Sequence, residues 1–226
     1  HNYMSQLSYN VDITMCIDAT GSMKPVIDNV KSIALNFDEK LKIELEKKEK
    51  RVDNIRIKLV LFRDIAHDGL DQALLETDFL NLPEESELFK ERLDITQASG
   101  GGDLPENSLE ALSTAMNSSW TKEGDRQRHL VILFTDAPAH PLEKSSSIAG
   151  DYPEGMPANF EEFVDMWEGQ VMDERSKRML IFAPDDYPWR TIAETCENVF
   201  WIESIAGKGL ADIHFDEILK GIVNSI

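Results

Sequence analysis

An aspartate and two hydroxyl side chains follow directly on the first apolar run of the sequence. In the segment TMCIDATGSMKPV (14–26), the apolar residues stop at Asp18, and Thr20 and Ser22 come next at alternate positions. Alternate positions in an extended segment face the same side, so both hydroxyls can point at the same ion as the carboxylate. These three side chains are therefore candidate oxygen ligands.

Two more aspartates stand in comparable places. Asp103 ends the glycine run GGGD ahead of a helical pattern, and Asp136 ends the apolar strand RHLVILFTD. Ligands of open parallel sheets bind at the carboxyl ends of the strands, where we expect the three aspartates to converge. Converging carboxylates repel one another and need a counter-charge, which a hard divalent cation such as Mg²⁺ supplies. No cluster of histidines and cysteines favours zinc instead.

Each of these residues also has a structural explanation when it is taken alone. A carboxylate directly after a strand is often a helix N-cap, and Ser22 could cap the helix that begins near Lys24. The combination of five such residues at the ends of successive elements favours the metal site.

The elements that would position these residues follow from apolar periodicity. Strands are expected at 11–17, 55–62, 128–136, 178–184 and 199–203, with a short edge strand within 74–82. Helices are expected at 24–50, 84–95, 108–120, 159–174, 189–198 and 210–226. Near-continuous apolar strands that alternate with helices of crossover length predict an α/β fold with a mostly parallel sheet covered on both faces.

The whole pattern is expected to form one domain, residues 4–226. The Ser-, Gly- and Pro-rich segment 143–159 lies between a strand and a helix of one pattern, so we expect a long loop there and no domain boundary. We expect this loop to shape the rim of the metal site because it follows Asp136. The first three residues, HNY, look like a vector remnant and are left out of the fold prediction.

Composition narrows the classes of function. The chain has 226 residues, of which 42% are hydrophobic and 29% charged, as in soluble globular domains. A net charge of −19 disfavours nucleic-acid binding and suits cations or basic partners. The two cysteines, Cys16 and Cys196, form no C-x-x-C pair. No apolar run approaches the ~20 residues of a membrane span, so we expect a cytoplasmic protein without membrane attachment.

Other polar residues near the strand ends give weaker evidence of a functional role. Arg63 and Asp64 are expected to pair or to hold a neighbouring loop. His67 and Asp68 are more typical of solvated loop residues than of a second cation site. His140 lies four residues past Asp136, the last candidate ligand, and we expect it to contact the metal ligands and not the ion itself.

The order of the motifs DATGSM, FRD, GGGDLPE, FTDAPAH and DYPEGMP resembles von Willebrand factor A domains. The resemblance is to the subgroup attached to alpha-type protein kinases, parts of which hemicentins share, and it runs from about Val11 to the last helix. The family's metal-ion-dependent adhesion site has Asp-x-Ser-x-Ser, a Thr on a second loop and an Asp after the central strand. Asp18, Thr20 and Ser22 match the first loop, with Thr in place of the first Ser, and Asp136 matches the last element.

The resemblance implies a doubly wound, Rossmann-like sheet with one antiparallel edge strand and Mg²⁺, Mn²⁺ or Ca²⁺ at the top of the sheet. In the family, Ser and Thr contact the ion directly, some Asp residues act through water, and a Glu or Asp of a partner protein fills the open position. Asp103 stands where the family has Thr, and we expect it to be a direct or water-mediated ligand. A third carboxylate should tighten cation binding and leave less positive charge for an acidic partner.

Three functions are compatible with these residues. The first is a non-catalytic, divalent-metal-dependent protein-interaction module. The second, a regulatory adaptor subunit of an ATPase, a chelatase or a kinase-linked stress system, rests on family-level analogy. The third is a Mg²⁺-dependent phosphohydrolase of the HAD type, which needs an acid two residues after its nucleophile, where this chain has Thr20. No Ser-His-Asp elbow or P-loop is present in the sequence.

Overall fold

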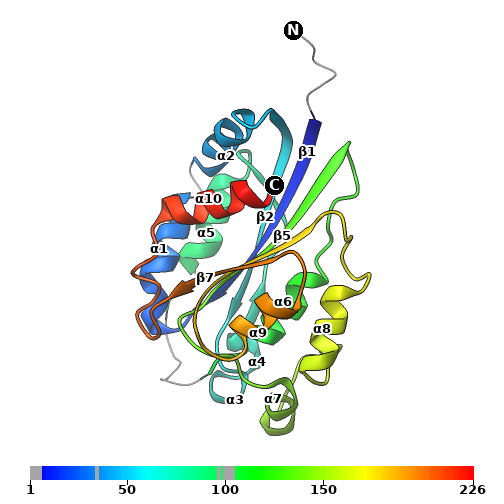
Figure 1. The fold of residues 1–226 in the computed structure, drawn as a ribbon. Coiled ribbons are helices and arrows are strands. Elements are labelled where there is room, and N and C mark those ends of the chain that lie inside the picture. Colours follow the sequence, from blue (N-terminus) through cyan, green and yellow to red (C-terminus); the bar gives the residue numbers. More distant parts are fainter. Residues whose placement is uncertain (1–6, 34–35, 96–97, 99–104) are drawn as a thin grey trace.

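A seven-stranded sheet forms the centre of the computed structural model, which describes residues 7–33, 36–95, 98 and 105–226 (Figure 1). The strands in this part are β1 (Leu7–Asp18), β2 (Lys50–Phe62), β3 (Leu74–Glu76), β4 (Leu80–Leu82), β5 (Arg126–Phe134), β6 (Lys177–Pro184) and β7 (Val199–Ser204). Their order is β3-β2-β1-β5-β6-β7, and β4 also pairs with β2. β1, β2, β5, β6 and β7 are parallel, which confirms the predicted α/β fold class.

The predicted antiparallel edge strand is present and is divided into two pieces. β3 and β4 both pair with β2 in antiparallel orientation. Between them, the side-chain oxygen of Thr77 accepts the Leu59 N–H at 3.0 Å, while the Thr77 N–H donates to the Leu59 carbonyl. A side chain thus takes over one ladder bond, and the edge strand is interrupted there.

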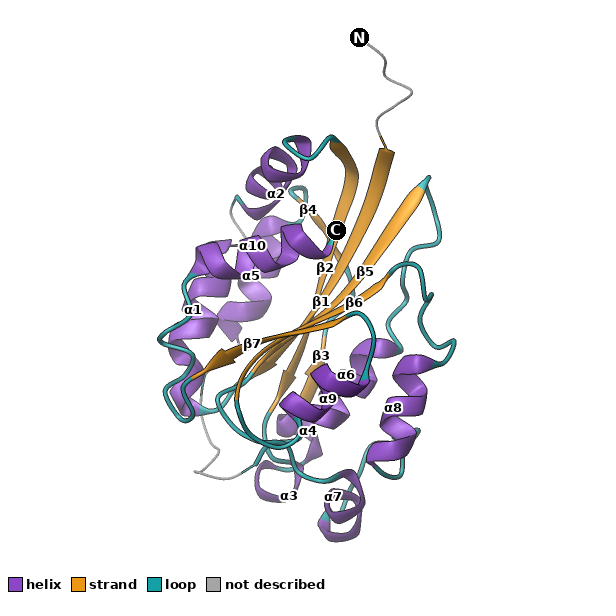
Figure 2. Cartoon of the chain, in the orientation of Figure 1, coloured by secondary structure: helices purple, strands orange, loops and turns teal. Residues whose placement is uncertain are grey.

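Helices cover both faces of the sheet (Figure 2). One face carries α1 (Lys24–Ile33), α2 (Phe37–Glu46), α5 (Ser86–Ile95) and α10 (Phe215–Ser225). The other carries α6 (Ser108–Met116), α8 (Phe160–Glu168) and α9 (Trp189–Thr195). The short helices α3 (Ile65–Asp68), α4 (Leu70–Ala73) and α7 (Leu142–Ile148) and the 3₁₀ turn η2 (Gly21–Met23) lie beyond the carboxyl ends of the strands.

Two hydrophobic cores result from alternation along the strands. On β1, Ile13 and Met15 are fully buried under α1, α2 and α10, whereas Cys16 is fully buried on the α6 side. A strand buried on both faces needs apolar residues at nearly every position, which is why it reads as a continuous apolar run. Each fully buried large side chain contributes about 1.5–3 kcal/mol of transfer free energy.

The prediction of one helix over 24–50 was wrong. α1 ends at Ile33 and α2 begins at Phe37, and Asn36 between them has the non-helical angles φ −144° and ψ 16°. The helix also ends earlier within the charged run than predicted. α2 ends at Glu46, and Lys50 is already the first residue of β2, where it pairs with Leu7. Glu49 makes this turn with φ 59°. Apolar periodicity alone did not reveal the turn at Glu49, since charged residues lie on both sides of it.

The predicted loop 143–159 also needs correction, because α7 occupies its first part. Asn107 donates from Nδ2 to the Ser145 hydroxyl at 2.6 Å and so ties α7 to the start of α6. Only residues 149–159 are irregular. In the part of the chain that the structure describes, no helix has both the length and the apolar character to cross a membrane.

Candidate metal centre

Asp18, the last residue of β1, is fully buried and held from three sides. Its Oδ1 accepts hydrogen bonds from the Thr20 N–H at 3.0 Å and the Thr20 hydroxyl at 2.6 Å. Its Oδ2 accepts one from the Thr135 hydroxyl at 2.9 Å. Burial raises the pKa of Asp18 to about 6, and the charge of Asp136 adds to this, although the Thr20 bonds oppose it. The hydrogen bonds therefore fix the carboxyl group in place, and its burial disfavours the ionised form.

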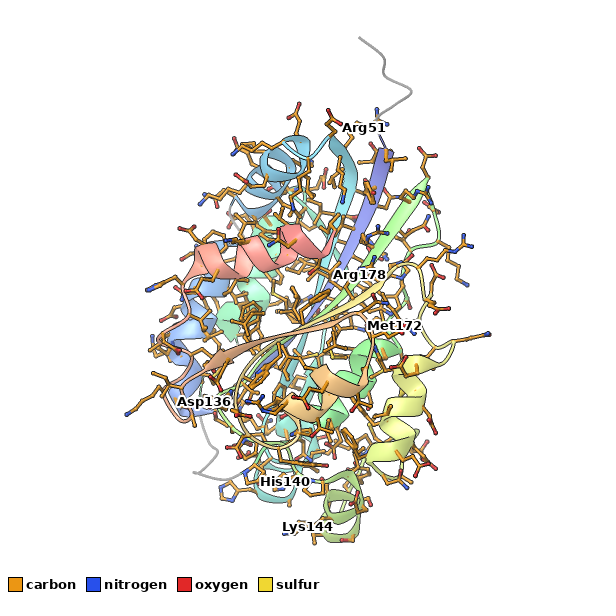
Figure 3. All side chains as sticks on the ribbon, viewed as in Figure 1. Arg51, Asp136, His140, Lys144, Met172 and Arg178 are labelled. Atoms are coloured by element: carbon orange, nitrogen blue, oxygen red, sulfur yellow. The ribbon has the colours of Figure 1, made fainter. Side chains whose placement is uncertain are left out.

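Asp136 lies two residues beyond β5 and is 5% exposed. Its Oδ2 accepts a hydrogen bond from the Gly209 N–H at 2.8 Å, and its carbonyl accepts one from the Gly207 N–H at 2.9 Å. Both donors belong to the loop between β7 and α10. This loop therefore fixes the orientation of the second predicted carboxylate, which Figure 3 labels at the carboxyl end of the sheet.

Ser22 reaches the same place from η2 and is exposed to solvent. It lines an open depression of about 350 Å³ together with Asp136, Ala137, Pro138, Asp186, Ala206 and Gly207. Thr20 is 5% exposed, and its hydroxyl is committed to Asp18. The structure thus places four predicted site residues at one end of the sheet: Ser22 is exposed, whereas Asp136, Asp18 and Thr20 are buried, and Asp136 lines the depression with Ser22.

Asp103, the fifth predicted ligand, lies outside the described residues. The structure does, however, describe the end of the same GGGDLPE motif. Glu106 is 1% exposed, and its Oε2 has no hydrogen-bond partner among the described residues. Its main chain is fixed, because its N–H donates to the Pro138 carbonyl at 3.1 Å and its carbonyl accepts from the His140 N–H at 2.9 Å.

Glu106 is the site residue that sequence reasoning missed. Burial is the main reason why its pKa rises to about 9. The charges of four aspartates at the same end of the sheet raise it further: Asp18, Asp64, Asp68 and Asp136. The available signal was its place in the GGGDLPE motif, three residues after Asp103, but a glutamate near a helix start is usually read as a first-turn residue.

The donor set fits a hard divalent cation. It consists of carboxyl and hydroxyl oxygens, and the charges of Asp18 and Asp136 act on the buried carboxyl of Glu106, whose Oε2 has no partner among the described residues. Within 7–33, 36–95, 98 and 105–226, no three His, Cys, Asp or Glu side chains are close enough to hold one ion by themselves. Hydroxyls and water would have to complete the shell, which suits Mg²⁺ because this ion usually keeps several waters.

The other polar residues hold the loops around the centre. Asp64 caps α3 by accepting from the Ala66 N–H at 3.0 Å, and its Oδ2 lies 3.1 Å from His140 Nε2. Arg63 donates from Nη1 to the Gln72 carbonyl at 2.7 Å. His140 therefore contacts the loop after β2, in line with the supporting role expected for Asp64 and Arg63.

A family model described as von Willebrand factor A domain matches residues 12–152 of the chain. A similar curated protein is "Alpha-protein kinase vwkA" of Dictyostelium discoideum, 29% identical over 147 residues. The match covers 65% of this chain and 21% of that protein, so the chain corresponds to about a fifth of its relative's length.

Solved structures of a pilus adhesin, SpaC of Lactobacillus rhamnosus GG, have a similar fold. One form aligns with a TM-score of 0.56 at 11% identity, and the open conformation with 0.54 at 12% identity. Each alignment covers 95% of this chain, and 31% and 30% of the adhesin chain respectively. At this level of identity the likeness concerns the fold.

Proposed function

Because the chain belongs to the von Willebrand factor A domain family, we propose that it is a divalent-metal-dependent protein-interaction module without catalytic activity. Mg²⁺, or Mn²⁺ or Ca²⁺ in its place, is held by the site residues named above: Asp18, Thr20, Ser22, Asp136, Asp103 and Glu106. A protein partner contributes an acidic side chain that completes the metal shell. Nucleic acid and membrane are not its ligands.

The observation that carries this proposal is the depression that the exposed Ser22 and the buried Asp136 line together. A volume of about 350 Å³ is enough to admit a carboxylate side chain together with ordered water. Two further carboxyl groups belong to the same end of the sheet, because Asp18 is fully buried and Glu106 is 1% exposed. The layout therefore offers anchored carboxyl groups and an open side.

Electrostatics explains why a cation would make this interaction conditional. The chain carries a net charge of −19, and an acidic partner side chain would meet Asp136 at the depression. Like charges at such a distance repel and disfavour binding. A divalent ion reverses the sign of the interaction, so partner binding is expected only when the ion is present.

The kinase relative favours a more specific form of this function. That relative is named an alpha-protein kinase, and the part of it that matches this chain is about a fifth of its length. A regulatory adaptor role in a kinase-linked system is therefore an extension of the module proposal. This extension specifies the kind of system to which the partner belongs, and it assumes the same metal site.

The phosphohydrolase alternative has weaker support. The residue two positions after Asp18 is Thr20, whose hydroxyl donates to Asp18 at 2.6 Å. A threonine does not replace a carboxylic acid as proton donor at neutral pH. We expect no turnover of a generic phosphate ester with Mg²⁺, and clear Mg²⁺-dependent turnover that disappears in Asp18→Asn would replace the module proposal by the enzyme.

Calorimetric titration of metal-free protein with Mg²⁺ and Mn²⁺ tests the site. We expect one binding event in the wild type and at least about tenfold weaker binding in Asp136→Asn, because a charged ligand is lost. The matched control is Asp165→Asn, an exposed residue of α8 whose charge is removed far from the site. Absence of binding in the wild type, or equal weakening in both variants, would contradict the proposal.

The same variants test the interaction. Capture of partner proteins on the immobilised domain should require Mg²⁺, fail in chelator and fail in Asp18→Ala, while Asp165→Asn captures as the wild type does. Titration of Asp103→Ala then decides whether this residue is a ligand. Weaker cation binding would place Asp103 in the shell, and unchanged binding would place it outside.

A further inference from the structure

β7 is the last strand on one side of the sheet, and no strand of the described residues pairs with its outer edge (Figure 2). The bonds to β6 show which of its main-chain groups face outward. The Met179 N–H of β6 donates to the Asn198 carbonyl at 2.9 Å, and Met179 lies opposite Val199. In a parallel pair, the residues on either side of the opposite residue make the bonds, so the even-numbered positions of β7 face β6. The N–H and C=O groups of Val199, Trp201 and Glu203 therefore point away from the sheet.

These outward groups have no hydrogen-bond partner in the part of the chain that the structure describes. An open edge is a template for pairing with another chain, and proteins protect such edges by short or interrupted strands. The opposite edge of the sheet is protected in this way, since β3 and β4 have three residues each and Thr77 separates them. β7 runs for six residues without a break. Of the two edges, β7 is therefore the one that can accept another strand along its length.

The side chains of β7 combine exposed apolar surface with a negative charge. Phe200 is 49% exposed, and Ile205, directly after the strand, is 57% exposed. Glu203 is exposed and forms no salt bridge within the described residues. Arg190, a cation of the neighbouring α9, pairs with Asp185 at 2.7 Å instead. A complementary segment would therefore carry an apolar side chain and a basic one.

β7 also leads directly to the candidate metal centre. The chain continues after Ser204 through Ala206 and Gly207, which line the depression together with Ser22 and Asp136. The Gly207 N–H donates to the Asp136 carbonyl at 2.9 Å and so fixes this connection. A segment paired with β7 therefore has one of its ends beside the depression.

We infer that β7 is the docking site for an extended, basic segment of a partner protein, which adds to the sheet as one more strand. The outward main-chain groups of Val199, Trp201 and Glu203 supply the hydrogen bonds, as in other cases of strand addition. An apolar side chain of the segment covers Phe200, and a basic one lies beside Glu203. A second copy of this chain is a poor occupant, because each copy carries a net charge of −19.

The inference rests on the proposed function in one respect, since it assigns the segment to the partner that completes the metal shell. The strand pairing itself needs no ion, so it is tested in chelator. The probe is a blocked peptide of alternating valine and lysine, as long as the six residues of β7. A peptide of alternating valine and glutamate with the same length is the matched control.

NMR of ¹⁵N-labelled protein measures the pairing at single amides. Only the free form exchanges an amide that the peptide covers, so exchange should slow about fivefold when about four fifths of the protein is bound. We expect this effect at Val199, Trp201 and Glu203, and almost none at Phe200 and Ile202, which already face β6. The glutamate peptide should leave all five amides unchanged. No protection by the lysine peptide, or equal protection by both peptides, would overturn the inference.

N-methylation of the lysine peptide separates strand pairing from attraction by charge. The main-chain N–H groups of alternate residues point to opposite sides of a strand, so methylation of either the valines or the lysines blocks the side that faces β7. At least one of these two methylated peptides should lose the protection, although both keep their charge. Binding of both as tightly as the parent peptide would overturn the inference.

Two variants of the protein test the acidic contact. Glu203→Gln should bind the lysine peptide about two- to fivefold more weakly, because an exposed ion pair is lost. Glu161→Gln is the matched control, since it removes an exposed glutamate of α8, and it should bind as the wild type does. Equal weakening in both variants would mean that only the net charge attracts the peptide, and would count against the site.

Two further measurements separate the inference from its alternatives. A dimer in analytical ultracentrifugation, with the outward amides of β7 protected in the absence of peptide, would make a second copy the occupant and overturn the partner segment. Peptide protection without any Mg²⁺ binding in calorimetry would support the strand addition and contradict the metal-dependent module. Mg²⁺ binding without peptide protection would overturn the strand addition alone.

Discussion

At the scale of single residues, the candidate metal centre depends on carboxyl groups that are buried without a cationic partner. Asp18 has its two oxygens satisfied by Thr20 and Thr135, whereas Oε2 of Glu106 is left without a partner in the described part of the chain. Burial raises the pKa of both groups, to about 6 and about 9 respectively. Burial of an uncompensated charge is costly, so a cation would relieve the cost.

The raised pKa values predict how stability depends on pH without metal. A carboxyl whose pKa is higher in the folded state contributes stability below its unfolded pKa and loses it as pH rises through the folded pKa. The pH range over which stability is lost therefore runs from 3.8 to about 6 for Asp18, and from 4.5 to about 9 for Glu106. In chelator, we therefore expect Tm to fall between about pH 5 and about pH 9.

Two comparisons isolate the residues responsible. Glu106→Gln should reduce the decline above about pH 6, since the pH range of Glu106 extends to about 9 and that of Asp18 only to about 6. Saturating Mg²⁺ should flatten the decline in the wild type, because the ion favours the ionised carboxylates. Differential scanning calorimetry at a series of pH values measures both. A decline above pH 6 that is identical in Glu106→Gln and the wild type would exclude Glu106 as its source.

At the scale of elements, the loop between β7 and α10 connects the last helix to the site. Its Gly209 has φ +58°, and its N–H donates to Asp136 Oδ2 at 2.8 Å. A Cβ atom at this position would overlap the main-chain carbonyl of Ser22. Glycine is therefore needed here both for the left-handed backbone and for the close approach of two chain segments.

Gly209→Ala should disturb the site through this loop. The overlap with the Ser22 carbonyl forces one of the two segments to move, so the hydrogen bond to Asp136 should lengthen or break. We expect lower stability, by about 2 kcal/mol or more, and several-fold weaker Mg²⁺ binding in calorimetry.

Gly155→Ala is the control for backbone strain alone. Gly155 also has positive φ, +75°, but a Cβ there would meet nothing within 4 Å. It should lose only about 1–2 kcal/mol of stability and keep the wild-type affinity for Mg²⁺. Equal Mg²⁺ affinity in both variants would mean that the loop does not orient Asp136.

At the scale of the whole molecule, charge is unevenly distributed. The net charge is −19, yet Lys50, Arg128 and Arg178 gather at one end of the parallel strands while the candidate metal centre occupies the other. A high net charge of one sign destabilises the compact state through self-repulsion. Salt screens this repulsion over a Debye length of about 10 Å at 0.1 M ionic strength.

The net charge predicts that NaCl stabilises the metal-free protein. We expect Tm in chelator to rise by about 2–5 °C between about 20 mM and about 300 mM NaCl, because screening weakens the repulsion among carboxylates. Scanning calorimetry at constant pH measures it, and Asp165→Asn should show nearly the same slope. A Tm that falls with salt would mean that attractive surface pairs, such as Arg190 with Asp185, outweigh the repulsion.

Much of the fold could be predicted from the sequence, because apolar periodicity is a local property. The apolar runs that contain Ile13, Ile57 and Ile132 became the parallel strands β1, β2 and β5 at the centre of the sheet. The break at Asn36 and the helix α7 were missed, and α7 depends on a contact made by a distant residue. The Ser145 hydroxyl that anchors α7, for example, accepts its hydrogen bond from Asn107.

The apolar pattern was enough to predict the fold class, and local signals pointed to four candidate ligands that lie among the described residues: Asp18, Thr20, Ser22 and Asp136. Their signal is local, since each follows the end of an apolar strand. Two features became visible only once the chain was folded: the burial of Glu106, whose Oε2 has no partner among the described residues, and the hydrogen bond from the Gly209 N–H to Asp136. Burial and hydrogen-bond partners depend on segments distant in the chain, so local patterns carry no record of them.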